Sequence, residues 1–292
     1  MKKEKKIIII GNKGMLGSDL SDLLTFENID FKGYDINDCD ITKYNDIYKL
    51  INGDEKVTNI INCAAYTNVD GCEDNIDQAL DVNGKAVENL VKICKEKEIH
   101  LTHISSDYVF DGEKKEPYME QDATNPLSVY GKSKLAGEWS VSQLGDKGLI
   151  IRSSWLYGKN GNNFVEAIIK KLETKEEIKV VKDQIGSPTY TVDLAKIIFI
   201  LSTNYKWGLF HVVNSGYCSW YKFAVWIAKF LGYDSNQIQK ITTEEFERKA
   251  TRPKYSVLAT KRLEKTIPDL PRNWRLALQQ YLIDTKRKVK IK

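Results

Sequence analysis

The stretch that most constrains the fold is an apolar run followed at once by a glycine-rich turn. Residues Lys6 to Ile10 are mostly β-branched, which is typical of a strand buried on both faces of a parallel sheet. Gly11, Gly14 and Gly17 follow at a spacing of three, and a helical pattern of leucines begins there. Strand, glycine turn and helix are the elements of a dinucleotide-binding unit. The sequence therefore predicts an α/β fold with a Rossmann-type doubly wound parallel sheet.

Each part of this turn has a physical use in holding a dinucleotide. Gly11 permits the tight turn, Gly14 lets the backbone approach a pyrophosphate, and Gly17 lets the helix pack close to the strand. The first helical residues, Met15 and Leu16, present free N–H groups at the positive end of the helix dipole. We expect these five residues to bind the diphosphate of NADPH or NADH.

Two signals concern the choice between these cofactors. Asp35 ends the second predicted strand, Ile29 to Tyr34, and an acid there binds the adenosine ribose hydroxyls of NAD and repels a 2′-phosphate. Lys13, inside the glycine turn, would attract that phosphate instead. Asp40 and Ile41 are expected to flank the adenine, although Asp40 also suits a helix N-cap. The sequence leaves NADPH and NADH both open.

Small residues follow the third predicted strand, Val57 to Asn62. Ala64, Ala65 and Tyr66 lie where the carboxyl edge of the sheet is expected, and small side chains there let a cofactor lie against the backbone. Asn83, inside the next predicted helix, either ties neighbouring loops together or lies on the surface. We expect the segment from Ala64 to Tyr66 to contact the cofactor.

A serine, a tyrosine and a lysine complete the pattern. The strand Leu101 to Ser106 ends in a hydroxyl at the same edge, and Tyr130 and Lys134 are one helical turn apart. A free tyrosine titrates near pH ~10, and a nearby ammonium lowers that pKa. Alone, the tyrosine–lysine pair fits a solvated helix face. After the glycine turn and Ser106, the pair indicates a site that delivers a proton to an alcohol or sugar oxygen.

Composition excludes several classes of function. The net charge of +4, from 44 basic and 40 acidic residues, is too small a bias for nucleic-acid binding. Basic residues cluster at both ends (Lys2, Lys3, Lys5, Lys6 and 286–292) and fit solvated termini. Five widely spaced cysteines indicate neither a disulfide framework nor a zinc site. The run Ile7 to Ile10 is too short for a signal peptide core or a membrane span. We predict a cytoplasmic protein with reduced thiols.

Over nearly its whole length the chain resembles the extended short-chain dehydrogenase/reductase family. The resemblance rests on the segments 105–112, 125–138, 152–157, 183–189, 252–256 and 270–274. Its implied fold is a dinucleotide-binding domain over residues 1–152 and a smaller α/β domain, mainly for a sugar nucleotide, over residues 153–292. Residues 183–215 are expected to return to the first domain.

Within the family, the resemblance is to reductases that act on dTDP-4-dehydro-rhamnose. It implies reduction of the C4 keto group to give dTDP-rhamnose, a step of polysaccharide biosynthesis, with hydride from NADPH or NADH. Tyr130 would protonate the developing alkoxide, and Lys134 would keep Tyr130 acidic and bind the nicotinamide ribose. Ser106 stands where the family usually has threonine; it keeps the hydroxyl that stabilises charge on the carbonyl oxygen.

The resemblance also implies residues that bind the nucleotide sugar. Tyr108 and Trp155 are expected to pack on the sugar, or else in the core. Arg252 is expected to pair with the diphosphate, or else to form a surface salt bridge. The full set of expected substrate-binding residues is Ser106, Asp107, Tyr108, Trp155, Gln184 and Arg252, with Ser187 and Thr189 as further wall residues. The three histidines, His100, His103 and His211, show no metal spacing and are interpreted as structural.

Three alternatives stay open. The chain is such a reductase, or another nucleotide-sugar epimerase or dehydratase of the family, or a non-catalytic cofactor-binding protein like the regulatory subunit of methionine adenosyltransferase. Dehydratases of the family have two acids after the strand-end hydroxyl, whereas here Asp107 and Tyr108 follow Ser106. Asp19 alone matches an acidic Mg²⁺ ligand of metal-binding relatives, so no metal site is assigned. A homodimer is also left open.

Overall fold

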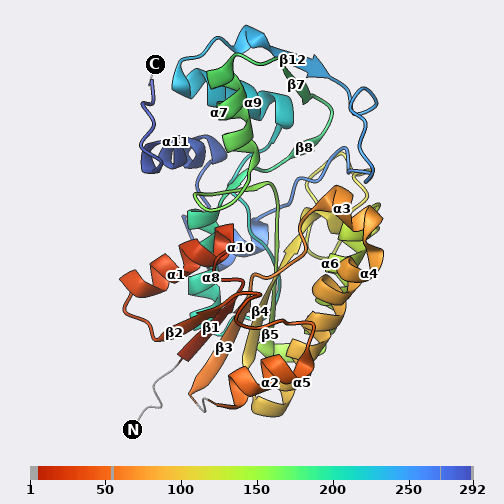
Figure 1. Ribbon diagram of the computed structural model, residues 1–292, viewed down its shortest axis with the longest axis vertical. Helices are drawn as coiled ribbons and strands as arrows, with labels where there is room; N and C mark the ends of the chain where they lie inside the picture. The colour runs from red at the N-terminus through yellow and green to blue at the C-terminus, as the bar shows by residue number, and fades with distance from the viewer. Residues whose placement is uncertain (1–5, 54–55, 270, 291–292) are drawn as a thin grey trace.

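A parallel sheet of six strands forms the lower half of the computed structural model, which describes residues 6–53, 56–269 and 271–290 (Figure 1). Lys2, Lys3, Lys5, Leu270 and Lys292 lie outside the described residues. The strand order is β10-β5-β4-β3-β1-β2, and every neighbouring pair is parallel. The strands are β1 (Lys6–Ile10), β2 (Phe31–Tyr34), β3 (Val57–Asn62), β4 (His100–Ser106), β5 (Gly148–Ser153) and β10 (Gly208–His211). The predicted α/β fold is confirmed.

The order of the strands fixes where a ligand can bind. From β1 the chain passes to β2 on one side, and then returns to β3 on the other side. In open α/β sheets, ligands bind outside the carboxyl ends of the strands at such a switch point. The glycine turn follows β1 directly, so the fold places it at this crevice.

Helices cover both faces of the sheet. One face carries α1 (Met15–Phe26), α8 (Thr191–Thr203) and α10 (Lys261–Thr266); the other carries α2 (Tyr44–Asn52), α5 (Ala86–Lys97) and α6 (Val129–Ser142). Ile7 and Ile9 pack into the first layer, whereas Ile8 and Ile10 pack into the second. Because helices cover both faces of the sheet, every side chain from Ile7 to Ile10 is buried, and β1 is a run of consecutive isoleucines.

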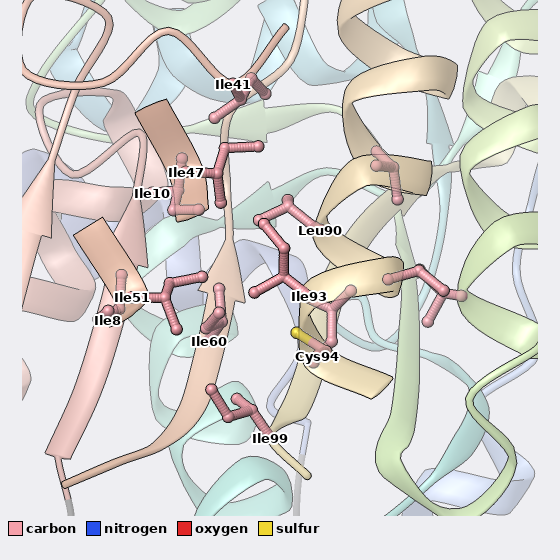
Figure 2. Packing of buried hydrophobic residues seen from close by; sticks show 14 of the residues in the cluster. Ile8, Ile10, Ile41, Ile47, Ile51, Ile60, Leu90, Ile93, Cys94 and Ile99 are labelled. Carbon is pink, nitrogen blue, oxygen red and sulfur yellow. The ribbon is translucent and has the colours of Figure 1, made fainter. Parts of the chain in front are cut away.

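Figure 2 shows the second of these layers from close by. Ile8 and Ile10 of β1 point toward Ile47 and Ile51 of α2, and Leu90 of α5 lies beside them. These side chains are all nearly inaccessible to water. Burial of apolar surface on both faces of the sheet therefore holds the site-bearing edges of β1, β3 and β4 in fixed positions.

The later part of the chain builds a second apolar cluster, at the top of Figure 1. Its elements are α7 (Phe164–Thr174), β7 (Ile178–Val181), α9 (Trp220–Leu231), β12 (Ile238–Ile241) and α11 (Trp274–Asp284). The aromatic residues of α9 pack into this cluster. Short paired strands join it to the main sheet: β6 (Leu156–Tyr157) with β9 (Thr189–Tyr190), and β8 (Ile185–Gly186) with β11 (Cys218–Ser219).

The predicted helix that contains Asn83 is wrong in detail. Residues 76–97 form α4 (Ile76–Leu80) and α5, separated by a π-helical segment, Asp81–Lys85. Another short helix, α3 (Val69–Asp74), precedes them and is capped by Asn68. π-Helical insertions are frequent at functional sites, and this one carries Asn83. Among the described residues, no helix has the length and apolar character needed to cross a bilayer.

Candidate active site

The glycine turn is held by close backbone contacts. Gly11 has a φ of +77°, which disfavours any residue with a side chain. A Cβ at Gly17 would lie 2.1 Å from the carbonyl oxygen of Gly11, and a Cβ at Gly11 would lie 2.8 Å from the nitrogen of Ala64. The turn after β1 therefore lies directly against the segment after β3, where the sequence places Ala64, Ala65 and Tyr66.

The start of α1 is an anion-binding end. Gly14 is its N-cap and supplies no side-chain hydrogen bond, and the first turn holds no acidic residue. The first backbone N–H groups of a helix lack partners within it, and the positive dipole end favours an anion. The glycine cradle and this helix end fit the diphosphate of a nicotinamide dinucleotide, with Gly11, Gly14, Met15, Leu16 and Gly17 as its contacts.

Both residues expected to select the cofactor, Asp35 and Lys13, bind groups close to them in the structure. The carboxylate of Asp35 accepts hydrogen bonds from the backbone nitrogens of Lys13 (3.1 Å) and Ile36 (2.8 Å). The ammonium of Lys13 pairs with Asp38 at 3.5 Å. Both side chains stay near the end of β2, so the structure keeps NADPH and NADH open.

The two residues expected to flank the adenine have different surroundings in the structure. Asp40 accepts hydrogen bonds from the backbone nitrogen (3.1 Å) and hydroxyl (2.7 Å) of Thr42, and the hydroxyl contact lowers the pKa of Asp40. It does not cap α2, whose N-cap is Lys43. The Ile41 side chain is buried in the cluster of Figure 2, so its apolar surface is used in the core.

The expected catalytic residues meet at the carboxyl edge of the sheet. Ser106 ends β4, and α6 begins just before Tyr130 because Ser128 caps the nitrogen of Gly131 at 3.2 Å. Gly131 allows a close approach, since a Cβ there would lie 2.2 Å from the carbonyl oxygen of Tyr108. The Ser106 hydroxyl forms a hydrogen bond with Tyr130, and the Tyr130 and Tyr108 rings are 5.5 Å apart.

Burial controls the charges of the tyrosine and the lysine. Burial raises the pKa of Tyr130 above its usual value, and the hydrogen bond with Ser106 opposes this only in part. Burial also lowers the pKa of Lys134 to about 8. The expected lowering of the Tyr130 pKa is therefore wrong for this structure, because burial is the largest influence on that pKa and raises it. At neutral pH Tyr130 keeps its proton, as a proton donor must.

Asp107 lies behind Ser106. It is 1% exposed, and its two carboxylate oxygens accept hydrogen bonds from Ser106 (3.0 Å) and Ser256 (2.5 Å). Burial raises its pKa to about 6. The backbone nitrogen of Tyr108 donates to the Ser106 hydroxyl at 3.2 Å. That Asp107 binds substrate stays a prediction; in this structure its carboxylate contacts Ser106 and Ser256.

A buried ion pair lies one turn beyond Lys134. Glu138 accepts two hydrogen bonds from Arg152, at 2.8 and 2.6 Å, and a third from Ser105 at 2.6 Å. Glu138 also favours the charged form of Lys134. Sequence reasoning missed this pair. The available signal was the spacing of Tyr130, Lys134 and Glu138 at intervals of four, which puts all three on one helix face.

Asn83 joins the cofactor segment to the catalytic helix. Its side chain is fully buried, accepts from the nitrogen of Tyr66 (2.8 Å) and donates to the Tyr66 carbonyl (3.0 Å) and to Ser133 of α6 (2.9 Å). Of the two readings that the sequence left open, the structure supports the tie between loops. Asn83 lies in the π-helical segment, and its buried side chain makes these hydrogen bonds.

The expected sugar-side aromatic residue is enclosed on both faces. Trp155 has a φ of +49°, and its ring stacks on Trp220 with centroids 3.6 Å apart. On its other face, a Cβ at Gly186 would lie 2.5 Å from the ring. A sugar can therefore meet only the edge of Trp155. Sequence reasoning missed this stack.

The other expected substrate residues have polar partners. Gln184 donates to the hydroxyl of Thr243 at 3.1 Å, and the Thr189 hydroxyl donates to the buried Ser187 carbonyl. Arg252 forms a two-pronged ion pair with Asp70, at 3.0 and 2.9 Å. The salt-bridge alternative for Arg252 therefore describes this structure.

The histidines and Asp19 show no metal arrangement. His103 and His211 are buried beside Asn62 (3.2 Å) and the carbonyl of Tyr118 (3.1 Å). No group of three or more His, Cys, Asp or Glu side chains suited to a metal occurs in the described part of the chain. Asp19 is buried, and burial raises its pKa.

Comparison with known proteins shows which family the chain belongs to. The chain matches the RmlD substrate binding domain over residues 5–287. It is 36% identical to a dTDP-4-keto-6-deoxy-D-glucose reductase from Streptomyces niveus, covering 94% of this chain and 95% of that protein. The structure resembles a dTDP-4-dehydrorhamnose reductase from Clostridium acetobutylicum (TM-score 0.92, 42% identity, 96% and 99% covered). It also resembles the Bacillus anthracis dTDP-4-dehydrorhamnose reductase in complex with NADP (TM-score 0.92, 38% identity, 96% and 99% covered). The chain belongs to the RmlD substrate binding domain family, the family of the dTDP-4-dehydrorhamnose reductases.

Proposed function

We propose that the protein is an NAD(P)H-dependent oxidoreductase that reduces the C4 keto group of dTDP-4-dehydro-rhamnose to dTDP-rhamnose. One observation carries the proposal: Tyr130, which keeps its proton at neutral pH, lies against Ser106 at the same sheet edge as the glycine cradle. The names of relatives that match nearly the whole chain supply the substrate.

The chain's residues divide the chemistry between them. The reduced nicotinamide, when bound, supplies the hydride. Tyr130 donates its proton to the oxygen at C4, a contribution of roughly 10²–10⁴-fold for a well-placed acid. To bind the same oxygen, Ser106 turns its one hydroxyl proton from Asp107 to the substrate, and it donates a hydrogen bond there as negative charge builds. Lys134 binds the nicotinamide ribose and stabilises the tyrosinate that proton transfer leaves behind.

The remaining residues hold this set in place. Asp107 fixes the Ser106 hydroxyl, and Asn83 fixes the segment after β3 against α6. We assign the sugar-nucleotide side mainly to residues 153–292, with Tyr108, the edge of Trp155, Gln184 and Arg252 facing the substrate. The five cysteines are free thiols, which fits a reducing cytoplasm. A homodimer stays a prediction.

A second keto sugar is a specific alternative. The Streptomyces niveus relative is named for dTDP-4-keto-6-deoxy-D-glucose, which carries the same C4 keto group. The residues placed at C4 act on an oxygen that both sugars share. The choice between them therefore falls to the substrate side of the site.

The test mixes the purified protein with each of these two keto sugars and with NADPH or NADH, and follows the absorbance of the reduced cofactor. We expect stoichiometric oxidation, with dTDP-rhamnose formed from dTDP-4-dehydro-rhamnose. Tyr130→Phe should reduce turnover by at least about 100-fold, because the proton donor is lost. Its cofactor affinity should stay near that of the wild type.

Tyr233→Phe is the matched control, since Tyr233 is partly exposed and follows α9. It should leave turnover unchanged. Tight cofactor binding without oxidation by either keto sugar would instead support a binding protein.

A further inference from the structure

An ammonium, a carboxylate and a guanidinium are buried together where α6 packs on the sheet. Lys134, Glu138 and Arg152 are 2%, 5% and 4% exposed. Lys134 and Glu138 are four residues apart in α6, so their side chains lie on one face of the helix, one turn apart. Glu138 accepts two hydrogen bonds from Arg152 and one from Ser105. Two buried positive charges therefore share one buried negative charge.

Strand pairing explains why Arg152 and Ser105 reach the same carboxylate. They are paired residues of β5 and β4, and side chains at paired positions of neighbouring strands leave the sheet on the same face. A further neighbour of Arg152, His211 at 3.5 Å, is neutral because burial lowers its pKa to about 3. Ser105 directly precedes Ser106 at the end of β4. Glu138 is therefore fastened to the strand end that carries the Ser106 hydroxyl.

Three further titratable groups lie near Lys134: Cys63 after β3, His103 of β4 and Tyr130 of α6. Burial raises the pKa of the Cys63 thiol to about 12 and lowers the pKa of His103 well below its usual value. Burial also raises the pKa of Tyr130, which keeps its proton. Near pH 8 all three groups are neutral. Glu138 therefore supplies the charge that opposes the loss of the Lys134 proton on burial.

We propose that Glu138 and Arg152 are positioning residues for Lys134: the Glu138 carboxylate keeps the buried ammonium charged, and Arg152 and Ser105 hold that carboxylate one turn away from it. The inference rests on the proposed function for the task of Lys134 in the reaction. A carboxylate so far from water needs a partner to stay ionised, and Arg152 is that partner. The pair thus lets Lys134 keep the charge with which it stabilises the tyrosinate.

The experiment follows the titration of Lys134 itself, by ¹³C NMR of the full-length protein with lysine labelled at Cε. Lys134→Met assigns the resonance. In the wild type the midpoint of the titration should lie near pH 8. Glu138→Gln keeps the shape of the side chain and should move the midpoint down by about one pH unit, because the favourable charge is gone.

Two more variants separate charge from structure. Glu138→Gln leaves Arg152 buried without its carboxylate, which is destabilising. The double variant Glu138→Gln/Arg152→Gln removes both charges, and its midpoint should also fall, since Glu138 is the charge of the pair that acts on Lys134. Arg152→Lys keeps both charges, so its midpoint should stay near that of the wild type.

Glu88→Gln is the matched control. Glu88 pairs with Lys92 of α5 at the same spacing of four residues (2.7 Å), but both side chains are exposed. Its loss should leave the Lys134 midpoint and the turnover unchanged. In every variant, the alkaline limb of kcat/KM should move together with the NMR midpoint.

A Lys134 midpoint that stays in place in Glu138→Gln, or in the double variant if the single one does not fold, would overturn the proposal, since the pair would then only join α6 to the sheet. A shift in Arg152→Lys as large as that in Glu138→Gln would overturn it as well, since geometry rather than charge would set the midpoint. The NMR titration needs no turnover, which separates the two ideas. If the midpoints move as expected but neither keto sugar is reduced, only the proposed function fails.

Discussion

Asp107 is a carboxylate almost out of contact with water, with two serine hydroxyls as its side-chain partners. Ionised, it accepts hydrogen bonds from both Ser106 and Ser256. Protonated, it must use one oxygen as a donor, and the hold on Ser106 weakens. Because burial raises the Asp107 pKa to about 6, this change falls within a range that an activity assay can reach.

We therefore expect kcat/KM for reduction to fall as the pH drops through about 6. Asp107→Asn should lose this acid limb and lower kcat about tenfold, the cost of one misplaced hydrogen bond to a reacting group. Asp146→Asn, at an exposed turn, is the control and should keep the wild-type profile. An acid limb that persists in Asp107→Asn would assign the titration to another group.

The alkaline side of the same profile should report Lys134. Its pKa is lowered from 10.5 to about 8, so the ammonium is lost as the pH rises through about 8. Since the ammonium binds the ribose and stabilises the tyrosinate, kcat/KM should fall above that pH. Activity that stays constant to pH 10 would contradict a need for the Lys134 charge.

At the scale of single residues, the sequence predicted which groups would react but not their charges. Ser106, Tyr130 and Lys134 follow from a strand end and a helical spacing, both of which are local. The pKa of Tyr130 depends on the surfaces that pack around it, and those come from distant segments. The direction of its shift was therefore predicted wrongly.

At the scale of elements, the glycine turn is the most constrained piece of backbone. Gly17→Ala would place a Cβ 2.1 Å from the carbonyl oxygen of Gly11, so β1 and α1 must move apart. We expect a loss of about 1–3 kcal/mol in the free energy of unfolding, typical of overpacking. The affinity for NADPH should also fall, because the diphosphate cradle is distorted.

Urea unfolding and a cofactor titration check this expectation. Gly53→Ala is the matched control, since a Cβ there meets nothing closer than 3.6 Å and φ is −79°. Gly53→Ala should keep both the stability and the cofactor affinity of the wild type. A Gly17→Ala protein with wild-type cofactor affinity would contradict the assignment of the cradle.

The sequence predicted the regular elements well and the irregular one poorly. The isoleucines of β1 and the leucines of α1 follow patterns in the sequence that directly indicate a strand and a helix. The π-helical segment at Asn83 has no such period, because its cause is a set of hydrogen bonds to Tyr66 and Ser133. Those partners are 17 and 50 residues away. No local pattern in the sequence predicts these hydrogen-bond partners of Asn83.

At the scale of the whole molecule, the main sheet is completed by the second half of the chain. β10 pairs with β5 at one edge of the sheet. α8 and α10 cover the same face of the sheet as α1. Cut off at residue 152, the chain would leave Ile104, Leu149 and Ile151 without their cover. The division at residue 152 stays a prediction, and residues beyond it complete the apolar layer that contains α1.

We therefore expect a fragment of residues 1–152 to lack cooperative unfolding. Far-ultraviolet circular dichroism in urea should give a broad transition, with strong binding of a hydrophobic dye, because one face of the sheet is bare. The full chain should unfold sharply and bind little dye. A sharp transition in the fragment would show that residues 1–152 bury a sufficient core alone.

The sequence by itself determined the fold class, and it predicted the residues that we propose for the cofactor cradle and for catalysis. Glycines at a turn, isoleucines in a strand and a tyrosine one helical turn from a lysine are local patterns with local causes. Only the tertiary structure decided which distant groups meet them. Asp107 lies 149 positions from Ser256, and Asp70 lies 182 positions from Arg252. Such pairs form because the path of the chain brings the segment after β12 back over the carboxyl edge of the sheet, and no spacing along the sequence encodes that path.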